Sequence, residues 1–380
     1  MDKYFTFNKY VTGAINVGRV NEARALANLL VQRENVVISE PPKSGKQSLV
    51  RQTFLNMQAS GAEFVPVIVD LTSLRSVADF VKMLSSELLK SFWSTPAEYA
   101  DAARNLFEST HLVFDADAYQ REGEVVSLSW DVDAGDLRAA VSLARRISEL
   151  KGKRVYVLLL EFQNVMFTED GDGILSAFED VLGEGPCNAG YVFCGSRINA
   201  MSQILRTHYR FRKCCERLRL PEIDTRLIID HIIRGFNSTG KVTERELLLG
   251  VCKLFRGNMF YINHFCSVCD ALSRGYIMDS VLTEALSQVI AVHQPRFLGM
   301  MYDLTAFQVR FLKAILDGHT KFSSTEIIEQ YKLNSSANVL RLKEALCRKE
   351  IVYFDDAGVP HIIDPLFEYW ARTAYYGMKI

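Results

Sequence analysis

The chain has 380 residues, and its 44 Lys or Arg nearly balance its 45 Asp or Glu. A net charge of -1 excludes a general attraction to nucleic acid or to anionic membranes. The length allows two or three domains, and no apolar run is long enough to span a membrane. The first residues form no apolar signal core, so we expect a cytoplasmic protein.

The first motif is Gly18-Arg19-x-x-Glu22, which precedes a helical pattern of apolar residues through Leu30. Two interpretations remain open for it. It is either a capped amphipathic helix that packs on the following strand, or a segment beside the adenine of a bound nucleotide, with Gly18 and Arg19 at the base.

A short apolar strand at 36–38 then leads through a tight loop to a second helical pattern, with Gly45 and Lys46 at the turn. This is the layout of a phosphate-binding loop, in which backbone N–H groups, a helix N-terminus and a lysine face the phosphates. The predicted nucleotide-binding residues are Pro42, Lys43, Ser44, Gly45, Lys46, Gln47 and Ser48.

The loop departs from the full pattern G-x-x-x-x-G-K-[ST] at two places. Glu40 stands where the first glycine belongs, and Gln47 stands where the magnesium-ligating Ser or Thr belongs. Ser48 offers a hydroxyl one position late. On this stretch alone, phosphate binding and a strand–turn–helix with a solvated lysine are equally supported.

A second strand is predicted at 64–69, and Pro66 inside it favours an edge position because proline cannot donate to a ladder. A helix follows at 77–90. Residues 92–135 mix aromatic residues with acidic turns, and we expect an irregular insertion there. A further helix is predicted at 136–150.

The third strand, 154–160, has six consecutive apolar residues and is expected to be buried on both faces. Glu161 follows it at the strand's carboxyl end, where ligands bind in parallel sheets. P-loop ATPases carry Asp-Glu at this place, for the magnesium shell and the attacking water. Here the two positions are Leu160 and Glu161, so Glu161 is the candidate catalytic residue.

A fourth strand at 190–194 ends near Ser196, which is expected either to contact a γ-phosphate or to cap the next helix. A fifth short strand is predicted at 217–220, after a basic run. Arg210 or Arg212 in this run is either an arginine finger toward a neighbouring subunit or part of a solvated loop, and we favour the loop.

Residues 224–295 are predicted to be helical, with Thr243-x-x-Glu246 as a capping box and Pro295 as a boundary. Cys266-x-x-Cys269 beside His264 could form half of a zinc site. The sequence has no second CxxC or HxxxH pair to complete the zinc ligands, so we favour buried positions in a helix for these cysteines.

Residues 303–372 predict three helices and a hairpin, which together make a winged helix. Capping boxes are expected at Thr305-x-x-Gln308 and Ser323-x-x-Glu326. From residue 303 to the end, ten Lys or Arg balance ten Asp or Glu. An uncharged domain is a poor binder of phosphate backbones, so a protein-docking role is favoured over DNA.

In order and spacing, these motifs resemble the archaeal-type ATPases, a branch of the AAA+/STAND P-loop NTPases that is also found in bacteria. The matching stretches are Gly18-Arg19-x-x-Glu22, PPKSGKQSLV at 41–50, LLLEFQ at 158–163, FCGSR at 193–197, GNMF at 257–260 and IIDPLFEYW at 362–370. The resemblance implies an α/β P-loop domain at 1–223, a helical lid at 224–295 and a winged helix at 303–372. It also implies ATP or ADP between the sheet domain and the lid.

The departures from the family pattern predict a degenerate site. Gln47 and Leu160 replace both magnesium positions, which removes the metal clamp on the transferring phosphoryl group. We therefore expect a nucleotide-binding switch or scaffold that hydrolyses ATP weakly or not at all, without a magnesium site and with an unidentified protein partner or a second copy of itself. The alternatives are an active ATPase using Lys46, Ser48 and Glu161, and a DNA-binding regulator acting through the winged helix.

Overall fold

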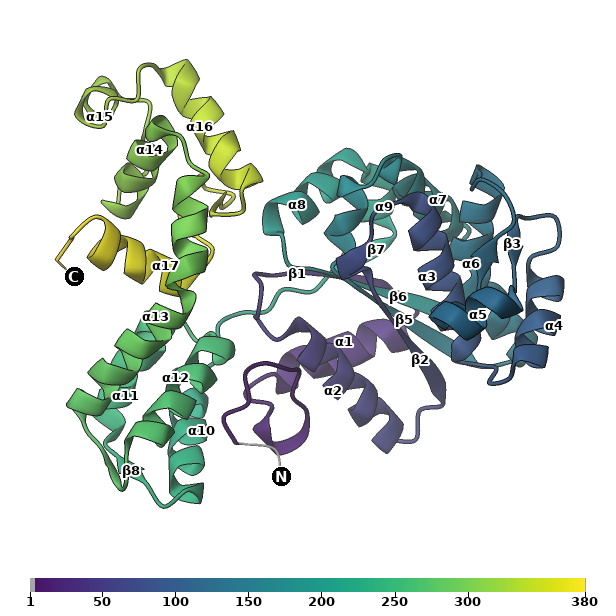
Figure 1. Cartoon of the computed structure of the whole chain (residues 1–380), viewed down its shortest axis with the longest axis horizontal. Coiled ribbons are helices and arrows are strands. Elements are labelled where there is room, and N and C mark those ends of the chain that lie inside the picture. Colours follow the sequence, from purple (N-terminus) through teal and green to yellow (C-terminus); the bar gives the residue numbers. More distant parts are fainter. Residues whose placement is uncertain (1–3, 380) are drawn as a thin grey trace. The chain divides into compact units, whose positions relative to one another are not determined.

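A parallel sheet of five strands organises one part of the chain in the computed structural model, which describes residues 4–379 (Figure 1). The strands are β1 Asn35–Ser39, β2 Phe64–Asp70, β5 Arg154–Leu160, β6 Ala189–Gly195 and β7 Cys215–Arg217. Their order is β2-β5-β6-β1-β7, and every neighbouring pair is parallel. The predicted α/β fold with a parallel sheet is confirmed.

Helices cover both faces of this sheet. Successive residues of a strand point to opposite faces, and apolar residues on both faces pack against helices. Val36 and Ile38 pack with helices α1 and α2, whereas Val37 lies in the core on the other face. The helices on the first face are α1 Val20–Val31 and α2 Lys46–Ala59. Those on the second are α3 Val77–Lys90, α6 Ala134–Lys151, α7 Gly171–Gly183, α8 Ile198–Thr207 and α9 Tyr209–Lys213.

Two strand predictions are confirmed in detail. β2, which contains Pro66, lies at an edge of the sheet, as expected for a residue that cannot donate to a ladder. β5 lies inside the sheet, and all of its residues after Arg154 are buried.

Residues 92–135 are more regular than predicted. They contain α4 Pro96–Leu106, β3 Leu112–Val113, α5 Ala116–Glu122 and β4 Ser127–Leu128, with β3 and β4 antiparallel. The start of α4 was visible in the sequence as a capping box, in which Thr95 and Glu98 bond each other's backbone N–H and Pro96 takes the first helical position. The acidic turns of this segment are helix N-caps rather than irregular loop, as at Asp115 and Asp133.

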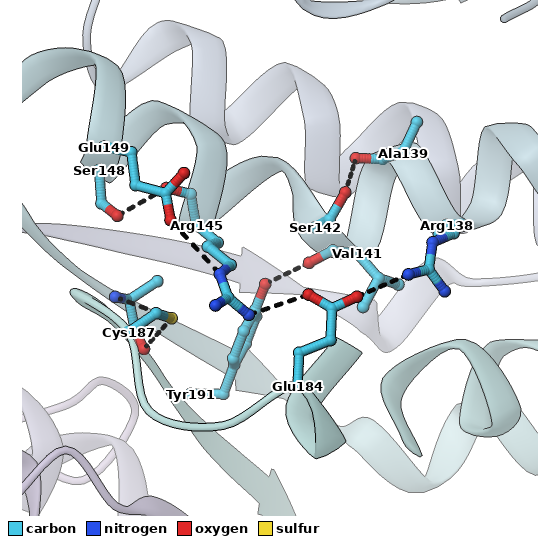
Figure 2. Close-up of polar contacts among 11 residues, drawn as sticks. Arg138, Ala139, Val141, Ser142, Arg145, Ser148, Glu149, Glu184, Cys187 and Tyr191 are labelled. Atoms are coloured by element: carbon cyan, nitrogen blue, oxygen red, sulfur yellow. Dashed lines mark hydrogen bonds and ion pairs between the residues drawn. The ribbon is translucent and has the colours of Figure 1, made fainter. Parts of the chain in front are cut away.

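The end of α7 is fastened to α6 by polar contacts, shown in Figure 2. Glu184 accepts hydrogen bonds from Arg138 (2.6 Å) and Arg145 (2.9 Å) of α6. The buried Tyr191 of β6 donates to the carbonyl of Val141 at 2.7 Å. These contacts fix the loop that leads from α7 into β6.

The second part of the chain is mostly helical and begins with α10 Thr225–Ser238, α11 Arg245–Phe255, α12 Met259–Leu272 and α13 Asp279–Tyr302. Two short parallel strands, β8 Val242–Thr243 and β9 Tyr276–Ile277, join its loops. The predicted capping box at Thr243 is wrong, because that hydroxyl donates to Ile277 in this ladder and Glu244 is the N-cap.

The helix end predicted before Pro295 is also wrong. α13 continues through this proline to Tyr302. A proline inside a helix removes one backbone hydrogen bond and strains the preceding turn. Phe297 and Met301, which follow it, are buried in the core, and their packing offsets the missing bond.

Residues 303–372 form the predicted winged helix. Its helices are α14 Ala306–Leu316, α15 Thr325–Gln330, α16 Ser336–Arg348 and α17 Pro365–Trp370, and its antiparallel wing is β10 Val352–Phe354 with β11 Pro360–Ile362. The capping box at Thr305 and Gln308 is present. The box predicted at Ser323 and Glu326 is wrong, since Ser324 is the N-cap of α15 and its bond is to the backbone N–H of Ile327.

One apolar core continues from α10 to α17, and polar contacts reinforce it. Asp364, the N-cap of α17, accepts hydrogen bonds from Arg296 of α13 (2.5 Å) and from the Tyr261 hydroxyl of α12 (2.7 Å). Arg256 donates to Glu368 and, at 3.2 Å, to the carbonyl of Ile362. These contacts join the four-helix segment to the winged helix.

By backbone contacts the chain divides into two compact units. We call Val20–Pro42 with Lys46–Leu220 the sheet unit, and Met1–Arg19 with Lys43–Gly45 and Pro221–Ile380 the helical unit. Among residues 4–379, no helix has the length and apolarity that crossing a bilayer requires.

Candidate nucleotide site

The loop between β1 and α2 is shaped around Lys46, the first residue of α2. The Lys46 ammonium donates to the backbone carbonyls of Glu40 and Pro41, each at 2.8 Å. Gly45 has a φ of 89°, which glycine adopts without steric cost. The lysine is only 8% exposed, so its charge lies within the loop rather than in solvent.

Glu40, which replaces the first glycine of the motif, has a structural contact. Its carboxylate accepts a hydrogen bond from the backbone N–H of Leu220 at 2.8 Å. This contact ties the end of β1 to the segment that follows β7. It gives the acidic side chain a role other than phosphate binding.

Gln47 and Ser48 occupy the first turn of α2. With its amide oxygen turned toward Arg51, Gln47 accepts hydrogen bonds from the Arg51 guanidinium at 3.2 and 3.3 Å. The Ser48 side chain is buried, at 8% exposure. Neither residue supplies the exposed hydroxyl that a P-loop normally offers to magnesium.

Polar residues meet where β5 and β6 end. Glu161 follows β5 in the left-handed region, with φ 55°, and precedes the turn η3 Phe162–Phe167. One oxygen of its carboxylate accepts from the Ser196 hydroxyl and from the Gln163 amide, the latter at 2.7 Å. The Gln163 oxygen accepts from the backbone N–H of Ser196 at 3.1 Å.

This network contradicts one of the two predictions for Ser196, the cap of the next helix. Its hydroxyl donates to Glu161 and does not cap α8, whose N-cap is Arg197 without a side-chain bond. Gln163 was missed as a site residue. The signal was its place two positions after Glu161, which puts it at the same sheet edge as the end of β6.

Leu160, at the position of the usual magnesium-shell aspartate, lies in the apolar core beneath α2. It is 9% exposed and belongs to the same cluster as Ile38, Leu49 and Cys194. Such a place provides no oxygen ligand, and Mg²⁺ requires oxygen ligands. The residues present therefore do not fit a magnesium ion of the usual kind.

Burial lowers the pKa of Lys46, while Cys194, Glu161 and Glu40 oppose this shift in that order. Cys194 is itself buried at the end of β6, and burial raises the pKa of its thiol to about 12. The thiol is therefore neutral at physiological pH. Of the two acidic side chains that favour the charged form of the lysine, Glu161 has the larger effect.

Lys43 and the predicted adenine-side residues belong to the helical unit. Lys43 lies with its ammonium 3.6 Å from the ring centre of Phe260. Gly18, with φ 71°, packs so closely on Ile223 that a Cβ atom would approach its side chain to 2.4 Å. Arg19 donates to the carbonyl of Pro221 at 2.6 Å.

A cavity of about 470 Å³ in the helical unit lies beside the residue on which Gly18 packs. Its lining residues are Glu222, Ile223, Thr225, Leu249, Cys252, Lys253, Arg256 and Gly257. The lining combines apolar side chains with the charged Glu222, Lys253 and Arg256.

The two candidate arginine fingers differ in their contacts. Arg210 pairs with Asp180 at 3.3 Å, and the Arg212 guanidinium lies 5.0 Å from the ring centre of Tyr209. Both arginines are exposed on α9.

The metal alternatives have structural explanations. Cys266 and Cys269 are fully buried in α12, so they are core residues as favoured from the sequence. Within residues 4–379, the one group with suitable spacing is His111, Asp133 and Asp136. The buried Asp136 already accepts from the backbone N–H groups of His111 (2.7 Å) and Asp133 (3.0 Å), as part of the cap of α6.

Comparisons with known proteins agree with this architecture. A family model described as "probable winged helix domain" matches residues 295–373. None of the curated proteins is significantly similar in sequence. A Walker-type ATPase of Pyrococcus abyssi is similar in structure, with a TM-score of 0.66 and 16% identity over 96% of this chain and 99% of that one.

Two proteins of Aeropyrum pernix are similar as well. Its ORC2 protein, solved in ADPNP and ADP complexes, has a TM-score of 0.59 and 14% identity over 96% of this chain and 93% of that one. Its ORC1 protein, solved with DNA, has a TM-score of 0.53 and 13% identity over 98% and 96%. At these identities the likeness shows the fold, in agreement with the resemblance found in the sequence.

Proposed function

We propose that this chain, which has the fold of the archaeal Walker-type ATPases, binds ATP or ADP and acts as a switch or scaffold with weak or no hydrolysis. The observation that carries the proposal is the contrast between Lys46 and Leu160. The lysine and the N-terminus of the 14-residue helix α2 are retained for phosphates. The magnesium-shell position is an apolar core residue.

The proposed nucleotide contacts follow from this geometry. Lys46 would exchange its bonds to the Glu40 and Pro41 carbonyls for phosphate oxygens. The backbone from Lys43 to Ser48 would supply N–H donors, and Pro42, which has no N–H, would shape the start of the loop. Gly18 and Arg19 are the residues that we propose for the base, as the resemblance in sequence implies. Glu161 is held by Ser196 and Gln163, which supports a positioning role for it rather than proton transfer.

Calorimetric titration of ATP and of ADP, with and without magnesium, tests the proposal. We expect binding that is independent of magnesium and abolished by Lys46→Ala. Unchanged affinity in Lys46→Ala would place the site elsewhere, and no binding in the unaltered chain would leave a scaffold that keeps only the fold. Arg121→Ala is a matched control, because it removes an exposed cation of α5, away from the loop in sequence, and should retain binding.

An active ATPase that uses Lys46, Ser48 and Glu161 is the second candidate. Its supporting observation is that Glu161 lies at the end of β5, close enough to raise the pKa of Lys46. Strongly magnesium-dependent ATP binding would favour it, and Glu161→Gln should then stop turnover without weakening binding. Turnover that persists in this variant would exclude it.

DNA recognition by the winged helix has less support. Lys343 of α16 lies over the rings of Phe354 (5.0 Å) and Phe322 (5.5 Å), so it is used inside the domain. The wing tip is acidic, with Asp355 bonding its own turn and His361 at 3.0 Å. We propose docking of a protein partner, or of a second copy, on this domain.

All eight cysteines are free thiols, which supports a reducing compartment such as the cytoplasm.

A further inference from the structure

Six cations gather along one short stretch of a nearly neutral chain. Residues 206–219 contain six Lys or Arg against one Glu, which gives a local net charge of +5 where the whole chain has -1. We call this set the basic edge; its members are Arg206, Arg210, Arg212, Lys213, Arg217 and Arg219. All six side chains are exposed.

The fold places these residues together at one margin of the sheet unit. Arg206 is in the last turn of α8, the next three lie on α9, and Arg217 ends the edge strand β7. Arg217 is in register with Val37, which faces the core that α8 and α9 cover. Its side chain therefore leaves the sheet on the side of those helices, which Figure 1 shows beside β7.

Most of this charge is not neutralised within the chain. Arg210 pairs with Asp180 at 3.3 Å. The Arg212 and Lys213 cations lie 5.0 and 4.7 Å from the ring centre of Tyr209, which is itself 51% exposed. Within residues 4–379, the side chains of Arg206, Arg217 and Arg219 form no hydrogen bond or ion pair.

From this arrangement we infer that the basic edge binds the sugar–phosphate backbone of nucleic acid. Guanidinium groups match phosphate oxygens in two-pronged hydrogen bonds, and five of the six cations are arginines. An exposed tyrosine among them adds a ring on which an unpaired base can stack. A polynucleotide carries phosphates at regular intervals, so it can contact several cations along the helix and the strand at once. An acidic protein surface with a few carboxylates offers fewer such contacts.

This surface consists of residues other than those of the proposed nucleotide site and of the winged helix. The phosphate loop lies at the start of α2, and none of the six cations contacts Lys46, Glu161 or Ser196. Binding at the basic edge therefore requires no nucleotide, and it does not use α16, the helix with which winged helices often read DNA.

The test measures fluorescence anisotropy of labelled single-stranded and duplex DNA with the full chain over a range of salt concentrations. Simultaneous Arg206→Ala, Arg217→Ala and Arg219→Ala removes the three unpaired cations. We expect at least a roughly tenfold loss of affinity at low salt. We also expect the slope of log affinity against log salt to become shallower by about one unit per cation removed. Changing the same three residues to Lys should retain most of the binding.

A matched control replaces Arg341, Arg348 and Lys349 by Ala, because these are three exposed cations on or beside α16. This variant should bind as the unaltered chain does. Loss of binding in the control but not in the basic-edge variant would assign nucleic acid to the winged helix and overturn the inference. So would absence of salt-dependent binding, or displacement of DNA by polyglutamate at lower concentration than by heparin, which would indicate an acidic protein partner.

Discussion

Asp364 should contribute a large share of the stability of the helical unit, because one carboxylate accepts hydrogen bonds from four residues. It caps α17 through the backbone N–H groups of Leu366 (3.0 Å) and Phe367 (3.1 Å). Losing such a cap costs about 1 kcal/mol. It also accepts from the Tyr261 hydroxyl, and Tyr261 is 2% exposed. A buried donor left without its acceptor costs about 1–3 kcal/mol.

The ion pair of Asp364 with Arg296 adds less, because the Arg296 side chain is 47% exposed and solvent screens the pair. Such pairs contribute about 0.5 kcal/mol. For Asp364→Ala we therefore expect a loss of about 3–4 kcal/mol in the free energy of unfolding. Asp364→Asn keeps one oxygen for the cap but places an amide NH2 where the other oxygen accepts from Tyr261 and Arg296. It should therefore lose about 1 kcal/mol less than Asp364→Ala, which is the contribution of the cap.

Urea unfolding followed by the fluorescence of Trp370 measures this difference, because Trp370 lies in α17 and is 2% exposed. Trp93 and Trp130 would be replaced by Phe in all variants so that the signal reports the helical unit. If Asp364→Ala and Asp364→Asn were destabilised equally, the cap would contribute nothing. If Asp364→Ala cost less than about 1 kcal/mol, the Tyr261 bond would contribute nothing either, and the reasoning would fail.

Three smaller predictions concern both units. Glu184→Ala should cost only about 0.5–1 kcal/mol in thermal unfolding, because its two ion pairs with α6 are partly exposed; a loss above about 2 kcal/mol would contradict this. Burial, with Lys43, His264 and Arg296 adding, lowers the pKa of His293 to about 4. Between pH ~6.5 and ~4, His293 is therefore protonated in the unfolded state but neutral in the folded state. The contribution of His293 to the free energy of unfolding should be complete above pH ~6.5. It should fall by about 1–2 kcal/mol as the pH decreases to ~4, a value reduced because the side chain is partly exposed. In His293→Phe the free energy of unfolding should depend less on pH over this range, as urea unfolding at each pH would measure. Thr305→Ala should cost about 1 kcal/mol by removing the cap of α14, whereas Thr305→Ser should be near neutral in the same assay.

The sheet was predictable because its signals are local. Apolar runs located four of the five strands, and Pro66 placed β2 at an edge through one missing donor. The fifth strand was predicted at 217–220, but β7 ends at Arg217, where that prediction began. The helix at Pro295 was not predictable in this way. The proline's local cost is outweighed by the burial of Phe297 and Met301, and that packing depends on residues distant in sequence.

The candidate site was predictable only in its outline. The sequence located the phosphate loop and the strand end at Glu161, since both follow from strand–loop–helix spacing. The sequence did not indicate where the Glu40 side chain points, because its hydrogen-bond partner, the backbone N–H of Leu220, lies 180 residues away in sequence. The pairing of Glu161 with Ser196 likewise needs the adjacency of β5 and β6, which sheet order provides and local pattern does not.

Both margins of the five-stranded sheet carry features that discourage further strands from adding to it. At β2 the ring of Pro66 interrupts the row of backbone donors. At the other margin β7 is only three residues long and ends in an arginine, with another at position 219. Unpaired strand edges are the usual templates for aggregation, and proline, shortness and charge are common defences against it. A variant that lengthens β7 with apolar residues in place of Arg217 and Arg219 should therefore form intermolecular sheet more readily than the natural chain.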